Sequence, residues 1–329
     1  MEMSRDLKQR AGFGVLIKRN LNICFLVFII LFGVLFANNF TSLANIQNLL
    51  RQITTNAILA TGFSICYIAD GFDLSQGNVC SACACVALTV LNATGSVLIA
   101  VGAALAVGLG FGLFNALVCK FIKGDGNDSY IVTLATSMIA LGFAYVYTGG
   151  GRTVTADSAM AATETYRAVA RGSTFGVTNL AFLAAAVMLV GAFILKKTKL
   201  GRRFYLVGAN KTAAYMSGIN SHSYRAYAFI ISGICVAIAC IAVTARNGTA
   251  SATCCKGFEN DAAIATIVGG NAPGNGKSGI ICTLIGVLCL GVMSNVMNLM
   301  RVDSTIQTII KSVVLILALY AQLVKSRNS

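Results

Sequence analysis

Two aspartates bring acidic chemistry close to apolar segments in the first half of the chain. Asp70 and Asp73 stand in the polar stretch 69–78, Ala-Asp-Gly-Phe-Asp-Leu-Ser-Gln-Gly-Asn, between two apolar runs. An ionisable side chain inside a membrane is a candidate functional group. A carboxylate beside a helix N-terminus has another role, because it accepts backbone N–H groups and opposes the positive end of the helix dipole. We favour this capping role for both aspartates.

Residues 271–278 nearly match a phosphate-binding loop, which requires Gly, four residues and then Gly-Lys-Ser/Thr. Counting back from Gly276-Lys277-Ser278 places Asn271, rather than glycine, at the first position. The segment also joins two apolar runs, whereas a phosphate-binding loop follows a soluble strand. We therefore exclude nucleotide binding by this chain.

Cysteine and histidine side chains could bind a metal or take part in catalysis. Residues 80–85 contain a C-x-x-C pair, but a zinc site needs a second ligand pair and no histidine is near. We interpret Cys254 and Cys255 as spectator thiols. His222 is the only histidine and forms no pair with a nucleophile, so we interpret it as a solvated loop residue. The sequence predicts no catalytic residue, no metal and no cofactor.

The composition predicts the elements that carry these residues. Hydrophobic residues make up 57% of the 329 residues and charged residues 11%, against roughly 25% charged residues in globular domains. So few charges cannot coat a soluble protein, and so many apolar residues exclude disorder. We predict an all-α polytopic membrane protein, with residues 1–329 forming one transmembrane domain. The net charge of +14 is explained by basic loops at a lipid surface, without a nucleic-acid partner.

Ten apolar segments indicate about ten transmembrane helices. The short pieces 54–69 and 262–270 are expected to be parts of broken or tilted helices, since a full span needs about 20 residues. The segments are 21–37, 54–69, 79–93, 97–119, 130–147, 178–195, 226–245, 262–270, 279–299 and 306–323.

The distribution of Lys and Arg predicts the orientation. With ten spans and the N-terminus inside, seventeen Lys and Arg lie inside and seven outside, while Lys311 falls within the tenth segment. This satisfies the positive-inside rule. It places both termini in the cytoplasm, together with the segment 1–20 and the loop 196–225. The loop 148–177 then lies outside, and the protein is expected in the cytoplasmic membrane.

Two glycine-rich polar stretches interrupt the apolar pattern, one in each half of the chain. They are residues 69–78 and 269–279. Irregular backbone at membrane depth is tolerated only beside protein or a water-filled cavity, and paired interruptions indicate an inverted repeat around a substrate path. Ordinary tight turns are the alternative. The residues assigned to these segments or to the path are Asp70, Phe72, Asp73, Ser75, Asn115, Gly269, Gly270, Asn271 and Asn295.

The basic loop 199–228 contains a short predicted helix. Residues 211–217 favour a helix that is capped by Asn210 and stopped by Gly218. A short amphipathic helix held at the membrane surface by basic flanks is suited to docking a cytoplasmic partner.

Several ordered motifs resemble the sugar-type permease subunits of ABC importers, as in ribose, galactose, xylose or arabinose uptake. Together they extend over about residues 53–320. The motifs are Gly71-Phe-Asp-Leu-Ser-Gln-Gly77, Ile131-Val-Thr-Leu-Ala-Thr136 with Tyr147-Thr-Gly-Gly150, Leu200-Gly-Arg with Val207-Gly-Ala-Asn210, Ala213-Ala214 and Ser217-Gly-Ile219, and Gly257-Phe-Glu259 with Ala263-Ile-Ala265 and Val268-Gly-Gly270.

The resemblance implies a ten-helix fold, a homo- or heterodimer of permease chains, two cytoplasmic ATPase domains and an extracytoplasmic sugar-binding protein. It implies that the segment from Asn210 to Ile219 is the coupling helix seated in the ATPase. Thr212, Asn275, Ser278 and Ala252 depart from the family pattern in these segments. The residues assigned to coupling are Gly208, Asn210, Ala213, Ala214, Ser217, Gly218 and Ile219.

The function expected from this resemblance is import of a monosaccharide by alternating access, with ATP hydrolysed on a separate chain. The binding protein is expected to dock on the outside loops 148–177 and 247–261. Two alternatives stay open: a permease of the same superfamily for nucleosides or branched-chain amino acids, and an ion-coupled secondary transporter. The second alternative needs a coupling acid inside a span, and the sequence places none clearly within a helix.

Overall fold

The computed structural model describes residues 21–123, 126–174 and 176–327. The predicted cytoplasmic segment 1–20 lies outside these residues. The helices are α2 (Leu21–Phe36), α3 (Leu43–Ile68), α4 (Gln76–Thr94), α5 (Val97–Ile122), α6 (Gly126–Tyr147), α7 (Ala161–Arg171), α8 (Asn179–Lys197), α9 (Lys199–Ala209), α10 (Lys211–Met216), α11 (Ser221–Asn247), α12 (Phe258–Val268), α13 (Ile280–Leu299) and α14 (Ser304–Arg327).

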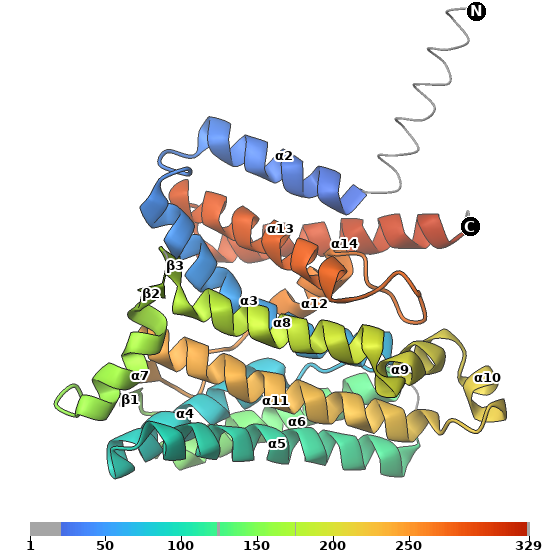
Figure 1. The fold of residues 1–329 in the computed structure, drawn as a ribbon, viewed down its shortest axis with the longest axis horizontal. Helices are drawn as coiled ribbons and strands as arrows, with labels where there is room; N and C mark the ends of the chain where they lie inside the picture. Colours follow the sequence, from blue (N-terminus) through green and yellow to red (C-terminus); the bar gives the residue numbers. More distant parts are fainter. Residues whose placement is uncertain (1–20, 124–125, 175, 328–329) are drawn as a thin grey trace, which may run out of the picture.

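Most of the long helices run along the long axis of the molecule, while α3 crosses it obliquely (Figure 1). The short elements other than α12 lie at its two ends. One end, here called the α7 end, holds α7 and two antiparallel strand pairs. These pairs are β1 (Val154–Thr155) with β4 (Thr249–Ala250), and β2 (Ser173–Thr174) with β3 (Val177–Thr178). The other end, the α10 end, holds α9 and α10. The start of α2 and the end of α14 also lie at the α10 end.

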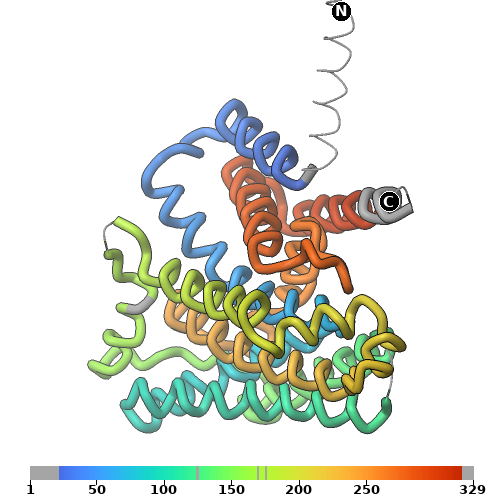
Figure 2. Tube along the Cα trace, turned by 45° about the vertical axis from the view of Figure 1, so that its right-hand side comes forward, coloured from blue at the N-terminus to red at the C-terminus, as the bar shows by residue number. Residues whose placement is uncertain are grey.

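The helices form two groups joined by α3. Helices α4, α5, α6 and α11 pack together on one side, and α2, α12, α13 and α14 pack on the other, as Figure 2 shows. Helix α3 contacts α8, α11, α12 and α13, so it holds the two groups together. Its second half is buried, with Ile58, Leu59, Phe63 and Ile65 at the centre of the apolar core.

The outer helices expose large apolar side chains, which suits a lipid environment. Six helices of the described residues are long and apolar enough to cross a membrane: α4, α5, α6, α8, α11 and α13. The apolar stretches 22–36 of α2 and 304–320 of α14 are shorter. Helix α3 is more polar in its first half, and α12 has only 11 residues. Each of the ten apolar segments falls on a helix, which confirms the all-α class, while the count of about ten spans is approximate.

Close helix crossings depend on small residues, as is usual in membrane bundles. Helices α5 and α11 cross where Gly108 and Gly112 face Gly233. A Cβ added to Gly108 would lie 2.6 Å from the carbonyl oxygen of Gly233 and 2.8 Å from the Cβ of Ala237. The same helix carries Gly110, where an added Cβ meets nothing within 4 Å.

We predict opposite effects for two alanine substitutions in α5. Gly108→Ala should destabilise the purified protein by about 1–3 kcal/mol, because the extra methyl group forces α5 and α11 apart. Gly110→Ala should be neutral or stabilising, since it adds helix propensity without a contact. Thermal unfolding of both variants in the same detergent tests this, and equal melting temperatures would contradict the tight crossing.

Candidate functional site

The loop between α8 and α11 folds into two short helices because side chains cap both of them. The Thr198 hydroxyl accepts from the amide of Gly201 at the start of α9, and the Asn210 side chain accepts from the amide of Ala213 at the start of α10. Gly218 then takes φ +73 and ends the turn, a conformation that glycine adopts at little cost. The predicted short helix after Asn210 is confirmed. Helix α9 was not predicted.

The α10 segment presents an exposed apolar tip. Tyr215 is 78% exposed and Met216 is 84% exposed, which is unusual for large apolar side chains outside a lipid-facing surface. Of the residues predicted for coupling, Asn210, Ala213, Ser217 and Gly218 are exposed, Gly208 and Ile219 are half-buried and Ala214 is buried. Their contact with an ATPase stays a prediction. Tyr215 and Met216 stand in the predicted helix but were not among the residues predicted for coupling.

Asp70 links the loop between α8 and α11 to the first glycine-rich stretch. Residues 69–78 and 269–279 are called the first and the second break from here on. The Oδ2 atom of Asp70 lies 2.7 Å from Nζ of Lys211, the first residue of α10, and 3.1 Å from Nη2 of Arg225 near the start of α11. Arg225 is only 2% exposed. Asp70 follows the C-terminal end of α3, and its carboxylate binds two cations. Its predicted capping role stays a prediction.

The backbone at Asp70 adopts an unfavourable conformation. Its φ is +59, in the left-handed region that glycine occupies readily and other residues rarely do. The first residue of α6 also packs on it, since a Cβ on Gly126 would approach the Oδ1 atom of Asp70 to 2.8 Å. Asp70 is therefore a junction of the α3–α4 loop with α6, α10 and α11. The strain is consistent with a position kept for its carboxylate.

Helix α9, in the loop between α8 and α11, packs against both breaks. A Cβ on Gly208 would overlap the carbonyl oxygen of Ile68 and lie 2.9 Å from the amide nitrogen of Gly274. The Tyr205 hydroxyl donates to the carbonyl oxygen of Ser278 over 2.7 Å. Burial raises the pKa of the Tyr205 phenol, so this group stays a neutral donor. Displacement of α9 and α10 would act on residues 69–75 and 269–279 together.

The backbone of the first break is satisfied by side chains of α6. The amide of Phe72 donates to the Ser129 hydroxyl over 3.0 Å, and the amide of Leu74 donates to the Thr133 hydroxyl over 3.2 Å. The Phe72 ring packs edge-on against Phe63. Irregular backbone in this position is thus stabilised by protein, as it must be where water is absent.

Asp73 organises a buried polar network around the start of α4. It accepts from the amide and hydroxyl of Ser75 over 3.1 and 2.6 Å, and from the hydroxyl of Ser232 in α11 over 2.6 Å. The Asn115 amide of α5 donates to the Ser75 hydroxyl over 3.0 Å. The backbone amide that Asp73 accepts from is that of Ser75, the residue before α4 begins. Its predicted capping of the helix stays a prediction.

A second buried network surrounds the other break. The Asn271 side chain accepts from the amide of Gly279 over 2.7 Å and donates to the Thr283 hydroxyl over 2.9 Å. The Ser64 hydroxyl of α3 lies 2.6 Å from that of Thr283. The carbonyl oxygen of Gly269 accepts from the Asn22 side chain, and Gly270 takes φ +95. This network joins α2, α3, α12 and α13 through the loop.

Asn115 and Asn295 are buried between helices. Asn295 exchanges two side-chain hydrogen bonds of 2.9 Å with Asn45, and Asn115 joins the Asp73 network described above. The Asn295 amide is engaged at both its oxygen and its nitrogen, whereas the buried Asn115 amide is engaged through its nitrogen and its oxygen has no hydrogen-bond partner among the described residues. Their predicted role in the path stays a prediction.

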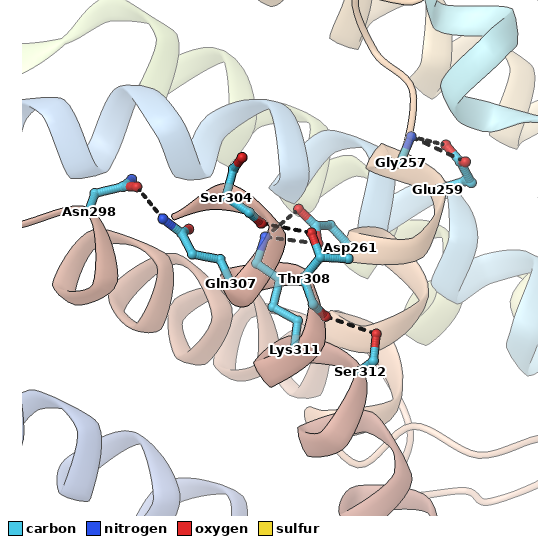
Figure 3. Close-up of polar contacts among 9 residues, drawn as sticks. All are labelled: Gly257, Glu259, Asp261, Asn298, Ser304, Gln307, Thr308, Lys311 and Ser312. Atoms are coloured by element: carbon cyan, nitrogen blue, oxygen red, sulfur yellow. Dashed lines mark hydrogen bonds and ion pairs between the residues drawn. The ribbon is translucent and has the colours of Figure 1, made fainter. Parts of the chain in front are cut away.

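An ion pair that the sequence analysis did not predict lies between α12 and α14. Nζ of Lys311 lies 3.1 and 3.0 Å from the two carboxylate oxygens of Asp261 (Figure 3). The position of Lys311 inside the tenth apolar segment was the available signal. The sequence placed no acid clearly within a helix, and Asp261 stands in the first turn of α12.

The segment before α12 enters the bundle, although the sequence predicted an outside loop there. From β4 at the α7 end the chain runs to Cys255, whose amide donates to the Ser81 hydroxyl of α4 over 3.0 Å. Ser81 is about 20 Å along α4 from the end of that helix at the α7 end. A Cβ on Gly77 would overlap the Glu259 carboxylate. Residues 251–257 therefore form a third irregular segment within the bundle, opposite the start of α4.

The fold defines a polytopic membrane protein whose helical segments are interrupted by buried polar stretches. Residues 45–319 match the family described as branched-chain amino acid transport system / permease component, and the chain belongs to this family.

Curated relatives extend over most of the chain. The ribose import permease protein of Escherichia coli (strain K12) is 33% identical over 280 residues, covering 85% of this chain and 86% of the relative. The L-arabinose transport system permease protein of the same organism is 28% identical, covering 89% and 87%. The D-allose transport system permease protein is 27% identical with the same coverage. No solved structure gives a significant match.

We predict that Asp70→Gly loosens α10 without unfolding the bundle. Glycine accepts the φ of +59 found at Asp70, but Lys211 and Arg225 lose their shared carboxylate. Hydrogen–deuterium exchange of amides 211–216 should become faster, while α3 and α4 keep their protection.

The matched control is Asn39→Gly, which changes another non-glycine residue of positive φ, in the α2–α3 connection. It should leave exchange in α10 unchanged. Equal exchange of α10 in Asp70→Gly and the parent protein would contradict the proposed tether.

Proposed function

We propose that this chain is the permease subunit of an ABC importer that carries a monosaccharide across the cytoplasmic membrane. The observation that carries this proposal is the match, over most of both chains, to permeases named for ribose, L-arabinose and D-allose. The partners are a cytoplasmic ATPase, an extracytoplasmic sugar-binding protein and a second permease chain. ATP is hydrolysed on the separate ATPase.

The α10 end faces the cytoplasm in this proposal. The Lys and Arg count supports this orientation, because residues 196–225 carry seven of the seventeen basic residues assigned inside. Tyr215 and Met216 supply exposed apolar anchors on a protruding tip, which suits insertion into a groove of the ATPase. Both termini then lie on the cytoplasmic side.

The transmission step follows from the contacts of α9 and α10. Movement of the ATPase displaces α10, and the Lys211–Asp70 pair passes this displacement to residues 69–75. Gly208 and Tyr205 pass it to residues 269–279. The two buried networks make each break move with the helices that it joins, so the two groups of helices can reorient about α3. Alternating access results from this rearrangement.

The α7 end is the docking face for the binding protein. Helix α7 and the β2–β3 pair supply exposed polar surface there. Residues 251–257 are not part of this face, because their chain runs into the bundle. The docking surface is therefore centred on residues 148–177.

The alternatives have weaker support. The family description names branched-chain amino acids, but the curated relatives described above are named for sugars. A proton-coupled transporter needs an acid that gains and loses a proton during transport. Asp261 already has a partner within the chain, because both of its carboxylate oxygens contact the Lys311 ammonium.

We predict that Met216→Asp abolishes binding of the ATPase and leaves the permease folded. The substitution removes an apolar side chain that would be buried in the ATPase groove. The new carboxylate would have to lose its water there, at a cost in free energy. Co-purification with a co-expressed ATPase of the sugar-importer class provides the measurement.

Arg152→Asp is the control for a carboxylate introduced at an exposed residue, because Arg152 lies between α6 and β1 at the α7 end. This variant should bind the ATPase as the parent does. Undiminished co-purification of Met216→Asp would remove α10 from the interface.

The substrate class is tested in proteoliposomes that contain the permease, the ATPase and the cognate binding protein. We predict ATP-dependent uptake of a monosaccharide such as ribose, and no uptake of leucine or adenosine. Uptake by the permease alone, driven by an ion gradient, would overturn the proposal.

A further inference from the structure

Helix α14 carries a polar stripe on one face. Ser304, Gln307, Thr308, Lys311 and Ser312 recur at intervals of three and four residues, which places them on the same side of a helix. Figure 3 shows these side chains along the part of α14 that meets the start of α12. Gln307 donates to the Asn298 side chain of α13 over 2.8 Å. We call the stripe together with Asp261 the α12–α14 seam.

The seam lies within the length of the membrane-spanning bundle. Lys311 is about 10 Å along α14 from the start of that helix. Asp261 follows the irregular segment 251–257, which reaches Ser81 well inside the bundle. The ion pair therefore lies part of the way along the bundle and does not stand at the end of a loop.

The seam is open on one side. Lys311 and Asp261 keep 18% and 19% of their side-chain surface exposed, and Ser304, Thr308 and Ser312 are exposed. The hydroxyls of Thr308 and Ser312 donate to backbone carbonyls one turn earlier, so lipid would tolerate them. The charged pair is different, because charges facing hydrocarbon carry a high cost. Its open side must face water or another polar surface.

We propose that the α12–α14 seam lines the route of the transported solute and makes direct contact with a neutral, polyhydroxylated solute such as a monosaccharide. This inference rests on the proposed function and deepens it. The Asp261 carboxylate accepts from a sugar hydroxyl, the Lys311 ammonium donates to one, and the Gln307 amide does both. Because the pair is neutral overall, it offers polar contacts without a net charge that would trap ions.

The geometry suits passage better than tight binding. The seam is one-sided, and its carboxylate and ammonium already satisfy each other. A sugar hydroxyl therefore replaces water at the open side and gains little net free energy. Weak contacts of this kind allow the solute to leave toward the cytoplasm.

The test compares cysteines on two faces of α14 in the assembled transporter. Thr308→Cys and Ser312→Cys lie in the seam, and Ile309→Cys and Val313→Cys lie on the exposed apolar face at nearly the same depth. A membrane-impermeant methanethiosulfonate is the probe, and the parent protein supplies the background from its own cysteines.

We expect the seam cysteines to react at least roughly tenfold faster than the apolar-face cysteines, because only a hydrated thiol ionises readily. Their labelling should block uptake, and ribose at saturating concentration should slow it. Equally slow labelling on both faces, or spontaneous cross-links between two copies through the seam without labelling, would overturn the proposal. If the parent transporter nevertheless takes up ribose normally, the proposed function stands and only the role of the seam fails.

If the seam cysteines react rapidly but only a non-sugar substrate slows the labelling, the lining role stands and the proposed substrate class fails. The double variant Asp261→Asn, Lys311→Gln tests the contacts themselves. It removes both charges together, so neither is left buried and unpaired. We expect normal ATPase co-purification with strongly reduced uptake, and undiminished uptake would overturn the contact role of the pair.

Discussion

The proposed coupling depends on the ion pairs that the Asp70 carboxylate forms with Lys211 and Arg225. A single oxygen atom contacts the first residue of α10 and a buried arginine of α11, while its backbone holds a conformation that glycine would adopt more easily. This arrangement fixes the protruding tip of the chain to the first irregular segment inside the bundle. Without the carboxylate, α10 would still be helical, but its movement would no longer be tied to the α3–α4 loop.

The same constraint explains the polar residues in the rest of the core. A membrane bundle with irregular backbone must supply partners for every free amide and carbonyl from its own side chains. Ser129 and Thr133 do so for the first break, and Asn271 does so for the second. These partners come from different helices, so each break joins several helices instead of forming a flexible loop.

The sequence predicted the features that depend on local patterns. Apolar length predicted the ten helical segments, and the Asn210 cap with Gly218 predicted α10. Features that depend on distant pairing were not predicted. Asp70 meets Arg225 across 155 positions and Lys311 meets Asp261 across 50, and periodicity contains no information about such partners. The inward course of residues 251–257 was missed because their polar composition also fits a surface loop.

The most direct test of the coupling role is the number of ATP molecules hydrolysed per sugar imported by transporters carrying Asp70→Asn. Asparagine has nearly the size of aspartate but lacks the negative charge with which Lys211 and Arg225 both pair. The account predicts that the ATPase still binds and hydrolyses ATP while ribose uptake falls sharply, so the ratio rises. A ratio equal to that of the parent transporter, at normal uptake, would contradict the claim that Asp70 transmits the movement.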